Sequence, residues 1–212
     1  MNWSMTPQEV FSISPIVPVM VIERIEDAVP LAKALFDGGI KIFEVTLRTH
    51  VALEAIRAIT TALPEALVGA GTVLTAEQYD AAVNAGSQFI ISPGSATKLL
   101  EHAAKQNIPL IPGVSTPTEI MNAMDLGYDH FKFFPAEANG GAKALKAISA
   151  PLSQVSFCPT GGINALNLSE YQALTCVKTV GGTWMLPMNA IDNGQWDRIT
   201  QLTKDALKVA SN

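Results

Sequence analysis

The chain has 212 residues, of which 48% are hydrophobic, and its 14 basic and 19 acidic residues give a net charge of -5. This length and apolar content suffice for the core of one domain, so we expect a single domain over residues 1–212. The acidic balance and the lack of any Lys/Arg-rich run argue against nucleic acid as a partner.

Nothing in the sequence points to a membrane or to an oxidising compartment. Residues 1–11 have no basic segment followed by an apolar core, and no stretch approaches the roughly 18 apolar residues of a membrane span. The cysteines, Cys158 and Cys176, have neither a CxxC spacing nor the density of a disulfide scaffold. We expect a cytoplasmic protein with no membrane partner, in which both cysteines are packing residues.

The first predicted element is a helix that begins near the N-terminus. Thr6-Pro7-Gln8-Glu9 combines a capping hydroxyl, a proline where its missing donor costs nothing, and an acid three residues after the cap. Because this segment precedes the first strand, we expect an extra helix that covers the floor of the fold.

Short β-branched runs then alternate with amphipathic stretches at intervals of roughly 20 to 26 residues, the length of a compact βα unit. Thr75 and Thr116 have the features of helix starts, and Gly86 and Gly127 fall where helices should stop. The eight predicted strands are residues 16–21, 41–47, 67–73, 89–92, 109–112, 131–134, 155–158 and 177–180.

Eight βα units favour a (β/α)8 barrel over an open, doubly wound sheet. The open fold usually has a glycine-rich phosphate turn after its first strand, whereas this chain continues with Val21-Ile22-Glu23-Arg24. We therefore predict an α/β protein built as one TIM barrel, in which functional groups belong at the C-terminal ends of strands.

Polar residues interrupt two of the predicted strands. Glu44, Thr46 and Arg48 share one face of the second strand, and Lys132 lies among phenylalanines in the sixth. The alternation does not show which face is inside, so Lys132 could be an outward lysine whose stem lies between helices. Alternatively it forms a Schiff base, because burial in a dry pocket favours the neutral, nucleophilic amine.

Glu44 and Arg48 also suggest specific roles. Glu44 is either a structural partner of Arg48 or the general acid/base that Schiff-base chemistry needs for its proton transfers. The planar guanidinium of Arg48 suits a substrate carboxylate, which it can bind in a bidentate manner.

Glycine pairs follow the last two strands, at Gly161-Gly162 and Gly181-Gly182. Loops at these positions of a barrel often bind phosphate through bare backbone N–H groups, although tight turns would also explain the glycines. The three histidines form neither an HxH nor an HExxH spacing, so we expect no metal site.

Seven segments, taken in chain order, closely resemble the 2-dehydro-3-deoxy-6-phosphogluconate (KDPG) aldolase family, also known as 4-hydroxy-2-oxoglutarate aldolase. The resemblance covers seven of the eight predicted strands, and its most specific segment is Phe131-Lys-Phe-Phe-Pro-Ala136. The other segments are Glu44-Val-Thr-Leu-Arg48, Gly69-Ala-Gly-Thr-Val73, Ser92-Pro-Gly94, Ile111-Pro-Gly113, Pro159-Thr-Gly-Gly162 and Gly181-Gly-Thr-Trp184.

The resemblance implies a class I aldolase that needs no metal or cofactor, forms a homotrimer and acts in the Entner-Doudoroff pathway. It would split KDPG into pyruvate and glyceraldehyde 3-phosphate, and 4-hydroxy-2-oxoglutarate into pyruvate and glyoxylate. The residue roles that it implies are Lys132 as the imine-forming lysine, Glu44 as the acid/base, Arg48 and Thr72 for the pyruvate carboxylate, Pro93, Phe134 and Thr160 for the pyruvyl pocket, and Gly161, Gly162, Gly181, Gly182 and Thr183 for the phosphate.

Two departures from the family pattern bear on the phosphate. Many relatives have serine where this chain has Thr183, and some have arginine where it has Val21. We therefore expect phosphate binding to depend mainly on uncharged donors. Two other functions remain open: a non-catalytic barrel that binds a phosphorylated ligand, and a phosphate-binding enzyme of the epimerase or thiamine-phosphate-synthase type, although no metal or pyrophosphate site for the latter is evident.

Overall fold

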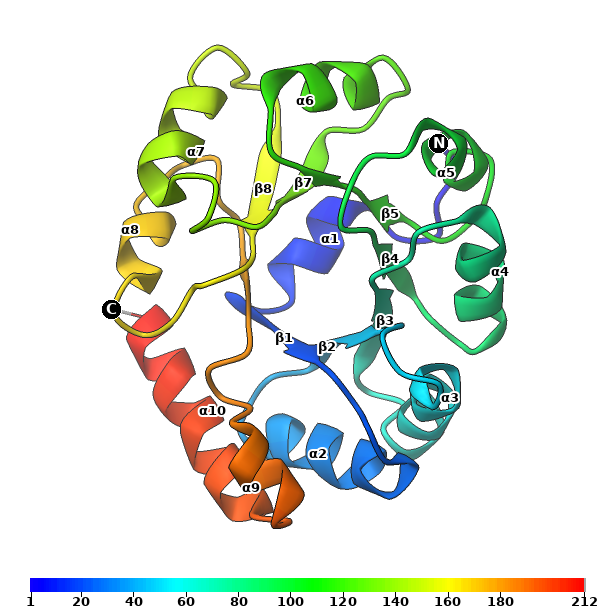
Figure 1. The fold of residues 1–212 in the computed structure, drawn as a ribbon, viewed down its shortest axis with the longest axis vertical. Helices are drawn as coiled ribbons and strands as arrows, with labels where there is room; N and C mark the ends of the chain where they lie inside the picture. The colour runs from blue at the N-terminus through cyan, green and yellow to red at the C-terminus, as the bar shows by residue number, and fades with distance from the viewer. Residues whose placement is uncertain (212) are drawn as a thin grey trace.

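The computed structural model describes residues 1–211, and within them strands and helices alternate as predicted (Figure 1). The strands are β1 (Ile16–Met20), β2 (Ile42–Thr46), β3 (Leu67–Gly71), β4 (Phe89–Ile91), β5 (Leu110–Ile111), β6 (Gly113–Val114), β7 (His130–Phe133), β8 (Ser156–Pro159) and β9 (Val180–Gly182). The helices are α1 (Pro7–Ser12), α2 (Ile25–Asp37), α3 (Ala52–Ala62), α4 (Ala76–Asn84), α5 (Thr97–Ala103), α6 (Pro117–Met124), α7 (Gly141–Ser149), α8 (Leu168–Gln172), α9 (Met188–Asp192) and α10 (Trp196–Ala210).

The strands close into a barrel. One sheet has the order β5-β4-β3-β2-β1-β9, a second has the order β6-β7-β8, and the pairings are parallel. Only Pro112 separates β5 from β6, and isolated bridges join Phe157 to Val177 and Thr160 to Gly181 between β8 and β9. With β5 and β6 counted as one interrupted strand, this is the predicted (β/α)8 barrel, and the open sheet is excluded.

The eighth strand lies later in the chain than we predicted. The sequence favoured residues 177–180, whereas β9 pairs Val180, Gly181 and Gly182 with β1. Thr179 turns its hydroxyl to the Ser14 carbonyl at 2.8 Å, and Val177 makes only a single bridge. The β-branched residues 177–180 therefore gave the wrong bounds for this strand, because the strand pairing continues through two glycines, which have low β-propensity.

The barrel is filled and covered by apolar side chains. Along β2 and β7, the outward-facing Phe43, Val45, Phe131 and Phe133 are fully buried beneath the ring of helices. Figure 1, viewed roughly down the barrel, shows helices α2 to α10 around its circumference. The core therefore lies both inside the barrel and between strands and helices, as expected for this fold.

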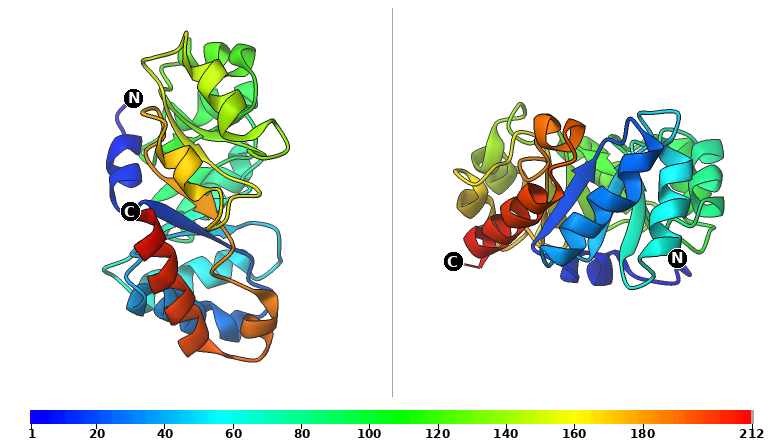
Figure 2. Two further views of the ribbon diagram at one scale, coloured as in Figure 1. Left: turned by 90° about the vertical axis from the view of Figure 1, so that its left-hand side faces the viewer. Right: turned by 90° about the horizontal axis from the view of Figure 1, so that it is seen from below.

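The extra N-terminal helix is present and begins as predicted. In α1, Glu9 Oε2 accepts from the Thr6 backbone N–H at 2.7 Å, and the Glu9 N–H donates to the Thr6 hydroxyl at 3.2 Å, which completes a capping box. Val10 and Phe11 are buried, and the Phe11 ring packs edge-on against His130, the first residue of β7. The helix thus lies across the N-terminal ends of the strands, at one end of the barrel in the side view of Figure 2.

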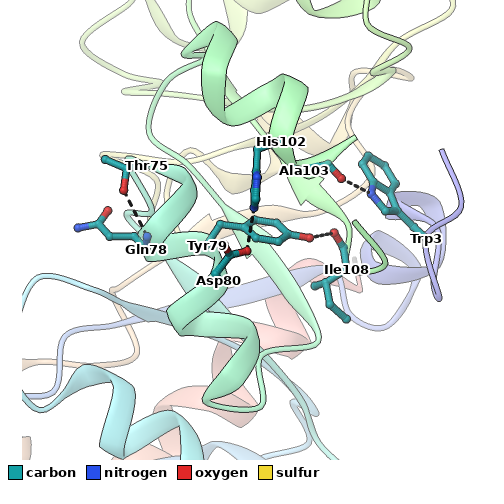
Figure 3. Close-up of polar contacts among 8 residues, drawn as sticks. All are labelled: Trp3, Thr75, Gln78, Tyr79, Asp80, His102, Ala103 and Ile108. Atoms are coloured by element: carbon teal, nitrogen blue, oxygen red, sulfur yellow. Dashed lines mark hydrogen bonds and ion pairs between the residues drawn. The ribbon is translucent and has the colours of Figure 1, made fainter. Parts of the chain in front are cut away.

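Polar contacts also fix the outer helices α4 and α5 (Figure 3). The Tyr79 hydroxyl donates to the Ile108 carbonyl at 2.5 Å, and His102 Nε2 lies 2.8 Å from an Asp80 oxygen. The Trp3 indole N–H donates to the Ala103 carbonyl at 3.0 Å. These contacts attach the N-terminal segment to α5, and they attach α4 both to α5 and to the segment that enters the N-terminal end of β5.

Candidate active site

A pocket opens at the C-terminal ends of the strands, and it gathers all twelve residues that the sequence proposed for the site. Three further residues line it: Val19 on β1, Thr46 on β2 and Ile163 after β8. Alternation had already placed Thr46 on the strand face of Glu44 and Arg48, although no role was assigned to it. Val19 and Ile163 are ordinary apolar residues that carry no such signal. The twelve proposed residues are Glu44, Arg48, Thr72, Pro93, Lys132, Phe134, Thr160, Gly161, Gly162, Gly181, Gly182 and Thr183.

Lys132 and Glu44 meet inside the barrel. Lys132 is 5% exposed and Glu44 is 1% exposed, and the lysine Nζ lies 2.9 Å from Glu44 Oε1. The lysine nitrogen also lies 5.2 Å from the centroid of the Phe134 ring. The outward-facing reading of the lysine is therefore wrong, because alternation on β7 places Phe131 and Phe133 against the helices and Lys132 in the interior.

The position of the Glu44 carboxylate depends on a glycine in the neighbouring strand. Gly71 pairs with Thr46 in the β2–β3 ladder, and a Cβ at Gly71 would lie 2.2 Å from Glu44 Oε1. Any larger residue there would displace the carboxylate or be displaced by it. Gly71 thus makes the room in which the acid reaches the lysine.

The next group in the pocket is suited to a carboxylate. Arg48 follows the end of β2, and Thr72 follows the end of β3, and both line the pocket. Thr72 has a φ of 58°, a left-handed conformation that is rare for a β-branched residue and that is concentrated at functional sites. A cation and a hydroxyl therefore flank the Lys132–Glu44 pair.

The far side of the pocket is formed by the two glycine loops. Gly161 and Gly162 have φ values of 105° and 80°. A Cβ at Gly181 would lie 2.2 Å from the Thr160 hydroxyl oxygen, and one at Gly182 would lie 1.8 Å from the Trp184 ring. These positions therefore exclude side chains and present backbone to the pocket, as an anion site made of N–H groups requires.

Charge is distributed unevenly across the pocket. The cations among its lining residues are Lys132 and Arg48, both on the side of Glu44. Val21, at the end of the first predicted strand, lies instead in a neighbouring hollow with Arg24 and Met188. The glycine-lined side thus offers uncharged donors.

Cys158 is the strand neighbour of Lys132. The two residues are partners in the β7–β8 ladder, and Cys158 is 3% exposed. Burial raises the pKa of its thiol to about 12, so the thiol is neutral at physiological pH. It adds a small apolar group to the surroundings of the lysine rather than a second charge.

Within residues 1–211, no three His, Cys, Asp or Glu side chains are grouped so that they could hold a metal ion. No helix in the same range combines the length and the apolar character needed to cross a membrane.

Comparison with known proteins identifies the family. The "KDPG and KHG aldolase" family profile matches residues 8–202. The chain belongs to this family. The KHG/KDPG aldolase of Escherichia coli is 52% identical over 209 residues, which are 99% of this chain and 98% of that protein.

Two solved aldolase structures have the same fold. A Legionella pneumophila KDPG aldolase, with pyruvate captured as a covalent carbinolamine intermediate, is 51% identical with a TM-score of 0.95, over 97% of this chain and 100% of the other. The 2-keto-3-deoxy-6-phosphogluconate aldolase of Zymomonas mobilis with 3-phosphoglycerate is 46% identical with a TM-score of 0.89, over 93% of each chain. The predicted family is therefore confirmed by sequence and by fold.

Proposed function

We propose that this protein is a class I aldolase that cleaves KDPG to pyruvate and glyceraldehyde 3-phosphate. It also cleaves 4-hydroxy-2-oxoglutarate to pyruvate and glyoxylate. The observation that carries this proposal is the buried contact of 2.9 Å between Lys132 and Glu44 at the C-terminal end of the barrel. The KDPG aldolases of known structure, one of them with covalently captured pyruvate, support it.

The first step is attack of Lys132 on the C2 ketone of the substrate. The ammonium group gives up a proton, for which the contacting Glu44 carboxylate is the nearest acceptor. The neutral amine then adds to C2 to form a carbinolamine. A proton returned by Glu44 lets the C2 hydroxyl leave as water, which produces a protonated imine.

The second step breaks the C3–C4 bond. Glu44 removes the proton of the C4 hydroxyl, directly or through one water, and that C–O bond becomes a carbonyl. The electron pair of the C3–C4 bond moves toward the protonated imine and forms an enamine. The aldehyde departs, C3 is reprotonated, and water releases pyruvate from Lys132.

The way in which the substrate binds determines which of its bonds lies beside the Lys132–Glu44 pair. The Arg48 guanidinium and the Thr72 hydroxyl hold the C1 carboxylate, while Pro93, Phe134 and Thr160 enclose the pyruvyl carbons. The backbone of Gly161, Gly162, Gly181 and Gly182, together with the Thr183 hydroxyl, receives the phosphate. These assignments are supported by the common location of all these residues in one pocket.

We further propose that the enzyme is a cytoplasmic homotrimer, needs no metal or cofactor, and acts in the Entner-Doudoroff pathway as one domain over residues 1–212. The last of these residues lies outside the described range. Family membership supports these assignments. A non-catalytic barrel would have no use for a buried lysine paired with an acid, so the catalytic proposal fits the site better.

Pyruvate release from KDPG, followed with lactate dehydrogenase and a chelator present, tests this function. We expect turnover by the unmodified protein, none by Lys132→Met, and normal turnover by the control Lys178→Met, whose lysine is exposed. Turnover by a folded Lys132→Met variant would exclude the Schiff-base mechanism, and loss of wild-type activity with chelator would revive a metal-dependent one.

A further inference from the structure

The loop that carries Gly161 and Gly162 is held from outside the pocket by the loop that follows β7. The Ala136 N–H donates to the Thr160 carbonyl at 2.8 Å, and the Glu137 N–H donates to the Gly161 carbonyl at 3.0 Å. Two backbone hydrogen bonds therefore join residues 136–137 to residues 160–161 beyond the ends of β7 and β8.

The Glu137 side chain lies directly on Gly162. A Cβ at Gly162 would fall 2.6 Å from Glu137 Cγ and 2.7 Å from Glu137 Cβ, so the acid's methylene stem covers the face of the glycine. The Gly162 carbonyl accepts from Asn164 Nδ2 at 3.3 Å and from Asn167 Nδ2 at 3.2 Å. Gly162 has a φ of 80° and few local restraints of its own, so these neighbours fix its orientation.

The position of Glu137 is in turn set by Tyr171 on α8. The Tyr171 hydroxyl donates to Glu137 Oε1, and the tyrosine is 1% exposed, so its ring is locked in the core. Burial, followed by the contact with Glu137, raises the pKa of Tyr171, which keeps the hydroxyl protonated as a donor. Neither residue lines the pocket, so any effect on substrate passes through the glycine loop.

We propose that Tyr171, acting through Glu137, is a positioning residue that holds the Gly161–Gly162 backbone in the shape that receives the substrate phosphate. This inference rests on the proposed function. The glycine side of the pocket carries no cation among its lining residues, so affinity for an anion there depends on the orientation of backbone groups. A loop free to rotate at two glycines would lose that orientation.

The test compares KDPG with the same acid lacking its phosphate, 2-dehydro-3-deoxygluconate. For Tyr171→Phe, we expect the KM for KDPG to rise roughly tenfold, with kcat little changed, as for loss of a hydrogen bond to a charged group. Turnover of the unphosphorylated acid, and pyruvate trapping on Lys132, should stay within about twofold, since neither uses the glycine loops.

Matched variants separate positioning from general stability. Tyr79→Phe removes the hydroxyl of another tyrosine that is also 1% exposed, and it should leave the ratio of the two activities unchanged. Glu137→Gln keeps the stem and an acceptor for Tyr171 and should remain close to wild type. Glu137→Ala removes the stem and the acceptor and should reproduce the effect of Tyr171→Phe. If Tyr171→Phe does not fold, Glu137→Ala provides the test in its place.

Equal losses on both substrates, or no loss on either, would overturn the positioning role while leaving the aldolase function intact. A wild-type protein that cleaves neither acid would reject the proposed function and this inference together.

Discussion

Lys132 Nζ and Glu44 Oε1 lie 2.9 Å apart, although the two residues are 88 positions apart in sequence and project from the strands β7 and β2. In the closed order of the barrel, these strands face each other across the interior. Each side chain supplies the buried partner of opposite charge that the other needs, since an unpaired buried charge is strongly unfavourable. The pair is thus a consequence of barrel closure and cannot form until both halves of the chain have folded.

Glu44→Gln tests the acid/base assignment. The amide keeps the size of the side chain and can accept from Lys132, but it cannot exchange protons, so we expect kcat for KDPG cleavage to fall about 10²–10⁴-fold. Steady-state assays measure this, with the exposed Glu54→Gln on α3 as the control. A Glu44→Gln variant with kcat within a few-fold of wild type would mean that another group moves the proton.

Gly71→Ala tests whether the space beside Glu44 is needed. The added methyl would fall 2.2 Å from Glu44 Oε1, so the carboxylate must shift, and we expect kcat to drop by at least about tenfold in a folded protein. Gly94→Ala is the control, because a Cβ there meets nothing within 4 Å. Unchanged kcat in Gly71→Ala would show that the acid works from more than one position.

Arg48→Lys tests recognition of the keto-acid carboxylate. Lysine keeps the charge but loses the planar, bidentate fork, so we expect the KM for KDPG to rise about tenfold or more. Arg57→Lys on α3 is exposed and should have no effect. If Arg48→Lys left KM unchanged, the carboxylate would have to bind elsewhere.

The pH dependence of Cys158 tests the dryness of the lysine pocket. Because its folded-state pKa is raised to about 12, the thiol should resist alkylation by iodoacetamide between about pH 7 and 9, whereas the less buried Cys176 should react first. The contribution of this raised pKa to stability is fully present below the thiol pKa of the unfolded chain, about 8.5, and is lost as pH rises from there through about 12. Peptide mass spectrometry would report the order of labelling, and equal labelling at pH 7 would indicate that water reaches the pocket.

The barrel, the polar residues Lys132, Glu44 and Arg48, and the glycine loops could be predicted from local patterns in the sequence. Five further pocket residues were predicted only from the family resemblance: Thr72, Pro93, Phe134, Thr160 and Thr183. The strand repeat gave the fold class, and Thr6 and Thr116 marked helix starts that the structure confirms through capping boxes. Alternation grouped Glu44, Thr46 and Arg48 on one face, although residue pattern alone could not say that this face was the interior.

Other features depend on contacts between distant segments and left no local signal. The eighth strand runs through Gly181 and Gly182, residues of low β-propensity that pair because β1 lies beside them. Tyr171 and Glu137 resemble an ordinary core tyrosine and a surface acid until the fold brings them together over Gly162.

Covalent trapping tests the central claim most directly: the protein is incubated with pyruvate and borohydride in the presence of a chelator, and the added mass is mapped by peptide mass spectrometry. We expect a reduced pyruvyl adduct on Lys132 that is absent from Lys132→Met and retained in Lys178→Met. No adduct on folded protein, or an adduct on another lysine, would contradict the assignment of Lys132 as the Schiff-base residue.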